Sequence, residues 1–242
     1  MRLKSSAFTI FALCLANSVQ AAQLMQVKIN GLDKELEQEV RSVIALPESN
    51  TVGVEISEGR LSYYINSLKS LVEDSLEPHG YYHAKVQINL VRNQQEAQIT
   101  IDINLGEPVR VRQHNIKFEG NASNDRFMGF WLESFEPQKG EIFNHDIYET
   151  SKLDISQALL DRGYFDQENT IHEVRVTRAE MSADIDLIWN SGVRYRFGDV
   201  KFEGNNFRPG LIEQLVGFEQ GKFYSQSQVF RLHESLSRLN YF

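Results

Sequence analysis

Apolar and polar residues alternate along three short stretches of the chain, and each stretch ends at a glycine. These stretches are residues 27–31, 116–120 and 200–204. Alternation with a period of two is typical of a half-buried β-strand, and the final glycine is typical of a turn. The three glycines recur at intervals of 89 and 84 residues, which is the length of a small domain and too long for a solenoid repeat. The pattern therefore predicts one small domain that occurs three times.

A second feature recurs inside each predicted unit, where a small residue and two aromatic residues follow a helical stretch. The three copies are Gly80-Tyr81-Tyr82, Gly163-Tyr164-Phe165 and Asn240-Tyr241-Phe242. Glycine and asparagine are the residues that tolerate the left-handed conformation after the end of a helix. The aromatic side chains that follow would then pack under the sheet.

Between these two features, apolar residues recur at spacings of three and four, which predicts two amphipathic helices in each unit. The predicted core-facing residues are Leu36, Val40, Val43 and Ile44, then Leu61, Tyr64, Ile65, Leu68, Leu71 and Val72 in the first unit; Phe127, Phe130 and Trp131, then Ile147, Tyr148, Ser151, Ile155, Ala158 and Leu159 in the second; and Ile212, Leu215 and Val216, then Val229, Leu232, Leu236 and Leu239 in the third. Aromatic stripes of this kind usually pack in a core rather than around a cofactor.

Two further alternating stretches follow the aromatic residues in the first two units and predict a β-hairpin. Their apolar positions are Ala84, Val86, Ile88 and Leu90, then Ile99, Ile101, Ile103 and Leu105 in the first unit, and Ile171, Val174 and Val176, then Ala183, Ile185, Leu187 and Trp189 in the second. One apolar face per strand indicates a sheet covered on one side by the helix pair. Each module is thus predicted to be β-α-α-β-β, an α+β fold.

The predicted modules divide the chain into residues 22–107, 108–192 and 193–242. The third is incomplete, because the sequence stops where the first two modules enter their hairpins. We expect a parent protein that continues beyond this point. Gly106-Glu107-Pro108 and Ser191-Gly192 join the modules with very few residues, so a semi-rigid arm is expected.

Residues 1–21 have the features of a cleavable export signal. Arg2 and Lys4 supply positive charge, residues 7–16 are a short apolar run, and Val19 and Ala21 suit a cut after position 21. The run falls well short of the roughly 20 apolar residues that span a bilayer. Cys14, the only cysteine, lies in this segment, so the exported protein is expected to contain no disulfide and no cysteine ligand.

Charge and motif content narrow the class of function. The chain carries a net charge of −8, and removal of the positive signal makes the remainder more acidic, which disfavours nucleic acid and anionic lipid and favours protein partners. The sequence lacks a Gly-x-Ser-x-Gly elbow, a phosphate-binding glycine loop and a His-Glu-x-x-His motif. We therefore expect no enzyme activity, no catalytic residue and no cofactor.

His79 and His83, with Glu77 nearby, are the one weak candidate for a metal cluster. Pro78 and Gly80 interrupt any helix at this point, so the histidine spacing has no defined ligand geometry. We interpret both histidines as exposed loop residues and expect no metal site.

The β-α-α-β-β module with its Gly-aromatic turn resembles the POTRA domain of outer-membrane protein assembly factors, and especially the TamA family. The resemblance rests on Gly31-Leu32, Leu36-Glu37, Val40-Arg41, Gly80-Tyr81-Tyr82, Gly163-Tyr164-Phe165-Asp166 and, most distinctively, Asn190-Ser191-Gly192-Val193-Arg194-Tyr195-Arg196-Phe197-Gly198. It implies tandem POTRA domains in the periplasm, ahead of a β-barrel in the Gram-negative outer membrane. That barrel lies outside this sequence, which contains no lipid-facing strands.

The same resemblance implies a function in which the parent protein, together with the inner-membrane-anchored TamB, inserts or secretes autotransporters and other unfolded outer-membrane polypeptides. The alternative is the POTRA region of another barrel-assembly factor or of a two-partner secretion transporter.

The resemblance also implies that the strand after each aromatic turn lies at a sheet edge, where its unpaired backbone groups could accept a partner strand. The candidate partner-binding residues are Lys85, Val86, Gln87, Ile88, Asn89, Leu90, His172, Val174, Arg175 and Val176. Their polar members have a second interpretation, because polar side chains also protect an edge strand against aggregation.

Overall fold

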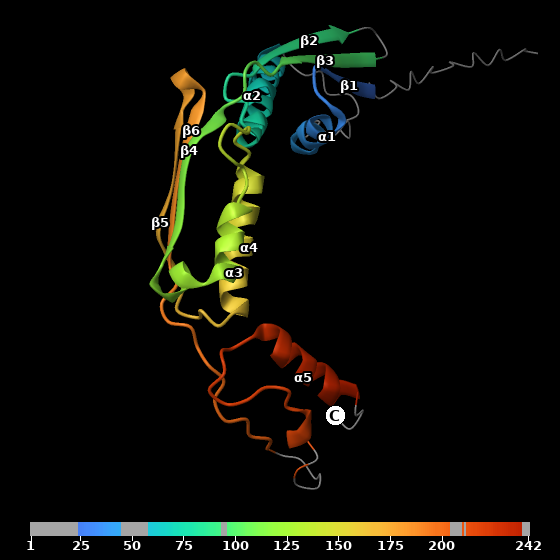
Figure 1. Ribbon diagram of the computed structural model, residues 1–242. Coiled ribbons are helices and arrows are strands. Elements are labelled where there is room, and N and C mark those ends of the chain that lie inside the picture. Colours follow the sequence, from blue (N-terminus) through green and yellow to red (C-terminus); the bar gives the residue numbers. More distant parts are fainter. Residues whose placement is uncertain (1–23, 45–57, 93–95, 204–209, 211, 239–242) are drawn as a thin grey trace, which may run out of the picture.

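The computed structural model describes residues 24–44, 58–92, 96–203, 210 and 212–238 (Figure 1). Two three-stranded sheets follow one another along the chain, and a third segment built around one helix follows them. In Figure 1 each sheet carries its helix pair on one side. The α+β class predicted from the sequence is confirmed. The predicted signal at 1–21, Gly204 and the turn at 240–242 lie outside the described residues.

The first module contains the predicted β-α-α-β-β order. Its elements are β1 (Leu24–Asn30), α1 (Lys34–Val43), α2 (Glu58–Leu76), the short 3-10 helix η1 (Glu77–His79), β2 (Lys85–Arg92) and β3 (Glu96–Asn104). The strand order is β1-β3-β2, with β1 parallel and β2 antiparallel to the central β3. The Asp33 side chain begins α1 by accepting the backbone N–H of Leu36 at 3.0 Å. Val72, Leu76 and Ile101 are fully buried between the helices and the sheet.

The second module repeats this topology. Its elements are β4 (Arg110–Glu119), η2 (Gly120–Asn124), α3 (Arg126–Glu133), α4 (His145–Asp161), β5 (Glu168–Thr177), η3 (Arg178–Glu180) and β6 (Ser182–Asn190). The strand order is β4-β6-β5, again with a parallel and an antiparallel neighbour on the central strand. The Asn144 side chain caps α4 by accepting the N–H groups of Asp146 and Ile147. Trp189, Tyr164 and Leu159 are almost fully buried in its core.

The third segment has less regular structure than the sequence predicts. It contains the 3-10 turn η4 (Glu213–Leu215) and the helix α5 (Gln226–Arg238). Residues 200–203, the described part of the expected strand, form no strand, and the first expected helix is reduced to η4. In each complete module the first strand pairs with the last one. No strand among the described residues pairs with residues 200–203, and an extended segment cannot satisfy its backbone groups alone.

Two predicted core residues of α3 lie at the surface. Phe127 is 52% exposed and Phe130 is 63% exposed, and Met128 is buried in their place. The Phe127 ring is covered instead by the Arg162 guanidinium, 4.4 Å from the ring centroid. A helix of only eight residues presents about two turns to the sheet, so a small rotation decides which side chains are buried.

Ile171 was also predicted on the wrong face. The β5–β6 register shifts between Asn169 and Ile171, so Thr170 has no residue paired opposite it on β6. Ile171 pairs with Ile188, whereas Val174 pairs with Ile185 and packs on the module core. Because residues 171 and 174 are an odd number apart, they point to opposite faces of the sheet. Ile171 is 42% exposed on the face without helices.

Candidate binding edges and module junctions

The strand β2 lies at an edge of the first sheet. It pairs through its whole length with β3, from Lys85 opposite Asn104 to Arg92 opposite Ala97. Among the described residues no strand pairs with its other side. The side chains of Lys85, Gln87 and Asn89 are exposed, and Val86 is buried. The edge therefore presents free main-chain hydrogen-bonding groups flanked by polar side chains.

The strand β5 has the corresponding position in the second sheet. It pairs only with β6 in the described part of the chain. His172 and Arg175 are exposed, and Arg175 forms an ion pair with Glu173 at 2.9 Å on the same strand. Val174 and Val176 are half-buried against the core. The two candidate strands thus lie in equivalent places in their sheets, but in separate modules, so they do not form one joint site.

The junction between the first two modules begins at the Gly80 turn. The Val109 backbone N–H donates to the Gly80 carbonyl at 2.8 Å, and the Phe143 N–H donates to the Val109 carbonyl at 2.9 Å. Gly80 has a φ of +90°, and a Cβ there would lie 2.7 Å from the Phe143 carbonyl oxygen. Glycine is therefore required both for the turn and for the close approach of the next module.

Side chains from the β5–β6 turn close the same junction. The Arg178 guanidinium forms an ion pair with Glu77 at 2.9 Å and lies over the Tyr82 ring, 5.2 Å from its centroid. The ring nitrogen Nε2 of His83 lies 2.9 Å from the Arg178 carbonyl oxygen. Glu77 and His83 are thus both engaged by Arg178, and they are not gathered around His79 as the weak metal cluster would require.

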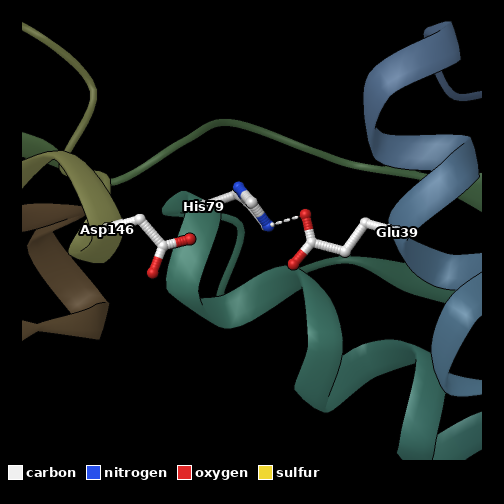
Figure 2. Close-up of side chains that lie close together, drawn as sticks. All are labelled: Glu39, His79 and Asp146. Carbon is white, nitrogen blue, oxygen red and sulfur yellow. Dashed lines mark ion pairs between the residues drawn. The ribbon is translucent and has the colours of Figure 1, made fainter.

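His79 differs from the exposed loop residue expected from the sequence, because its side chain is only 13% exposed. It lies between Glu39 of α1 and Asp146 of α4 (Figure 2). Glu39 and Asp146 were missed by the sequence analysis. They are 107 residues apart, and no local motif links two residues on different modules.

The second junction has the same main-chain pattern as the first. The Tyr195 N–H donates to the Gly163 carbonyl at 2.8 Å, and the Tyr224 N–H donates to the Tyr195 carbonyl at 3.0 Å. Gly163 has a φ of +89°, and a Cβ there would lie 2.7 Å from the Cβ of Tyr224. Val109 and Tyr195, each a few residues past the preceding sheet, therefore make equivalent contacts.

A polar cluster around Asp125 reinforces the second junction. The Asp125 carboxylate accepts from Arg162 at 2.7 Å and from the Tyr164 hydroxyl at 3.0 Å, and Arg194 approaches it at 3.5 Å. Burial alone would raise the pKa of Asp125, but hydrogen bonds from Arg162, Tyr164 and the Phe127 N–H outweigh it and lower that pKa. Burial, together with the hydrogen bond to Asp125, raises the pKa of Tyr164 to about 12.

Two family models match parts of this chain. Residues 26–105 match POTRA domain TamA domain 1, and residues 195–242 match the POTRA model described as surface antigen variable number repeat. A curated relative is the outer membrane protein assembly factor BamA of Neisseria meningitidis serogroup B, which is 25% identical over 152 residues. That alignment covers 58% of this chain and 18% of the relative, so the chain corresponds to under a fifth of that protein.

Solved structures of low sequence identity also resemble the chain. One is BamA POTRA3-5 of Haemophilus influenzae, with 18% identity and a TM-score of 0.45, covering 91% of this chain and 87% of that one. Another is POTRA1-3 of the periplasmic domain of Omp85 from Anabaena, with 17% identity and a TM-score of 0.32, covering 89% and 84%. Within the described ranges, no helix is both long and apolar enough to cross a membrane.

The repeated β-α-α-β-β modules, their recurrent glycine junctions and the two matching family models lead to one assignment. The chain carries POTRA domains of the Omp85/BamA superfamily.

Proposed function

We propose that this chain is the periplasmic POTRA arm of a TamA-type outer-membrane assembly factor. Its parent, anchored in the outer membrane by a barrel outside this sequence, would insert or secrete autotransporters and other outer-membrane proteins together with TamB. The match of residues 26–105 to a TamA POTRA model supports the TamA type. In this proposal residues 22–107, 108–192 and 193–242 are the three successive POTRA units, and the arm acts by binding rather than by catalysis.

The observation that carries the proposal is the recurrence of an open edge strand in both complete modules. Unfolded outer-membrane polypeptides contain segments destined to become β-strands. Such a segment could pair with β2 or β5 through main-chain hydrogen bonds, which carry little sequence information and so suit many clients. The exposed polar side chains of these strands would keep the edges from pairing with one another when no client is present.

The glycine junctions support a serial arrangement of these edges. Main-chain hydrogen bonds at Gly80 and Gly163 connect each module to the next. Neighbouring modules are therefore joined by more than a linker, and their edges would be offered to a client in a restricted orientation. A long polypeptide could then contact more than one edge at a time, which raises the overall affinity without any new contact.

Proline substitution tests strand pairing directly. Gln87→Pro and Arg175→Pro each remove one main-chain donor from a candidate edge, whereas the matched Gln87→Ala and Arg175→Ala variants keep it. We expect the proline variants to lose binding of client polypeptide and of TamB, and the alanine variants to retain both. Equal binding by the proline and alanine variants would refute strand pairing at these edges. Circular dichroism establishes that each variant is folded.

A second measurement needs no substitution. A synthetic ten-residue peptide with apolar residues at alternate positions is added to the wild-type protein. The rate of amide hydrogen exchange is then measured for each residue. The proposal predicts slower exchange within residues 85–90 and 171–177. Protection confined to the helices would place peptide binding elsewhere and would contradict the proposal.

A further inference from the structure

The first module junction contains a group of side chains that the proposed function does not use. Glu39 extends from α1, His79 from η1 and Asp146 from the first turn of α4, and Figure 2 shows the His79 ring between the two carboxylates. One ligand-type atom from each residue lies within 4.8 Å of the other two. Glu39 and His79 belong to the first module, and Asp146 belongs to the second.

The contact of His79 with Glu39 is close but poorly directed. Nε2 of His79 lies 2.8 Å from Oε2 of Glu39, yet this buried nitrogen has no hydrogen-bond partner with acceptable geometry. The carboxylate oxygen therefore lies off the direction in which the ring nitrogen would donate or accept. On its other side the ring approaches the Asn144 amide only at 3.4 Å. The Glu39 carboxylate therefore lies at ion-pair distance from this nitrogen, while the hydrogen-bonding direction of the buried nitrogen stays unfilled.

The three residues supply a ligand set that suits zinc. An imidazole nitrogen and two carboxylate oxygens bind Zn²⁺ at about 2.0 to 2.2 Å, so ligand atoms on one ion lie about 3.3 to 3.5 Å apart in tetrahedral geometry. Nε2 of His79 and Oε2 of Glu39 are 2.8 Å apart, and the three ligand atoms all lie within 4.8 Å of one another, so binding one ion would move His79 and Glu39 slightly apart. Ca²⁺ and Mg²⁺ prefer sites built entirely of oxygen, so the imidazole favours zinc over either.

We propose that Glu39, His79 and Asp146 bind one Zn²⁺ ion that bridges the first and second POTRA modules. The ion would complete its coordination with water. It would hold α1 and η1 of one module against the first turn of α4 of the next, beside the Val109–Gly80 hydrogen bond. Zinc would thereby narrow the range of angles between the modules. This inference goes beyond the proposed function and differs from the expectation drawn from the sequence, which included no metal site.

Calorimetric titration of the purified chain with zinc chloride, in buffer free of chelators, tests for the site. We expect one saturable site and a saturable rise in melting temperature, with no such effect from magnesium chloride. Glu39→Gln and Asp146→Asn should each weaken zinc binding by about tenfold or more. Glu77→Gln is the matched control, because it removes a carboxylate at the same junction that pairs with Arg178. It should leave zinc affinity unchanged.

Two outcomes would overturn the site. One is zinc binding that does not saturate, and the other is a saturable affinity that survives both Glu39→Gln and Asp146→Asn, because either result means adsorption at other histidines. Asp146 is exposed, so Asp146→Asn tests the site even if a change at the largely covered His79 disturbs folding. Neither outcome bears on client binding at β2 and β5, so failure here leaves the proposed function standing.

Bridging is measured separately from binding. In the protein without residues 1–21, which contains no other cysteine, fluorophores are attached at Tyr63→Cys in the first module and Leu153→Cys in the second, where the native side chains are 77% and 64% exposed. Zinc should narrow the distribution of transfer efficiencies between the two dyes, and Asp146→Asn should abolish the narrowing. Zinc binding without narrowing would contradict the bridge.

Discussion

The backbone N–H of Tyr195 donates to the carbonyl of Gly163 at 2.8 Å and so joins the third segment to the second module. The same contact, made by Val109 with Gly80, joins the second module to the first. The turn glycine therefore has two tasks at each junction. It ends a helix in a left-handed conformation, and it leaves room for a neighbour where a side chain would collide.

Gly163→Ala is expected to destabilise the second module and its junction. The substitution forces an L-residue to a φ of +89° and places its Cβ 2.7 Å from the Cβ of Tyr224. The left-handed conformation alone costs roughly 1–2 kcal/mol, and relief of the collision adds to this. Urea unfolding followed by circular dichroism measures the loss of free energy of unfolding.

Gly129→Ala provides the control for that substitution. Gly129 lies within α3, and nothing lies within 4 Å of the Cβ that it would acquire. Alanine is favoured over glycine inside a helix by about 0.5–1 kcal/mol, so this variant should be slightly more stable than the wild type. A Gly163→Ala variant that behaves like Gly129→Ala would show that the junction does not need glycine.

Asp125→Asn is expected to lower the free energy of unfolding at pH 7 by about 1–3 kcal/mol, because a hydrogen-bonded charge is lost beside Arg162. The pKa of Asp125 is lower in the folded protein than in the unfolded chain. The stabilisation that it supplies is therefore complete above the unfolded pKa, near 4, and is lost as the pH falls through the folded pKa.

Urea unfolding of the wild type and of Asp125→Asn from pH 7 to pH 3 measures this effect. The difference between the two stabilities should narrow as the pH falls below about 4. A difference that stays constant over the whole range would mean that the Asp125 charge contributes nothing, and that the substitution acts through packing alone.

Residues 199–238 are expected to exchange their amide hydrogens faster than β4 and β6. Its described part pairs with the preceding chain through one isolated bridge, between Phe223 and Arg196, and contains no sheet. Without ladder hydrogen bonds on either side, its extended residues open at low cost. Hydrogen exchange with mass spectrometry compares the regions in one experiment. Equal protection in both would contradict the expectation.

The sequence predicted the two complete modules well, because alternation and helical spacing are local signals. Residues 116–120 fall in β4 and its turn, and the apolar positions from Val86 to Leu90 fall in β2. Which strand lies at the edge of a sheet depends on the order of the strands, and the structure provides that order. The binding role of these edges stays a prediction.

The errors have a common physical origin. Ile171 lies on the opposite face because Thr170 has no partner across the strand pair, and no residue type signals a bulge reliably. Phe127 and Phe130 were placed in the core because they are aromatic, but tertiary packing set the rotation of α3. Asp146 meets Glu39 and His79 only through the angle between two modules, and the residue pattern within one module does not encode that angle.

The main-chain character of the junctions has a consequence for how such arms evolve. In the main-chain contacts at both joints the donor and acceptor are peptide groups, and within these contacts only the turn position is restricted in residue type, to glycine. Val109 and Tyr195 have unrelated side chains yet make the same contact. Modules could therefore be duplicated, exchanged or lost along an arm, and their surfaces could diverge toward new clients, without a new joint having to be built each time.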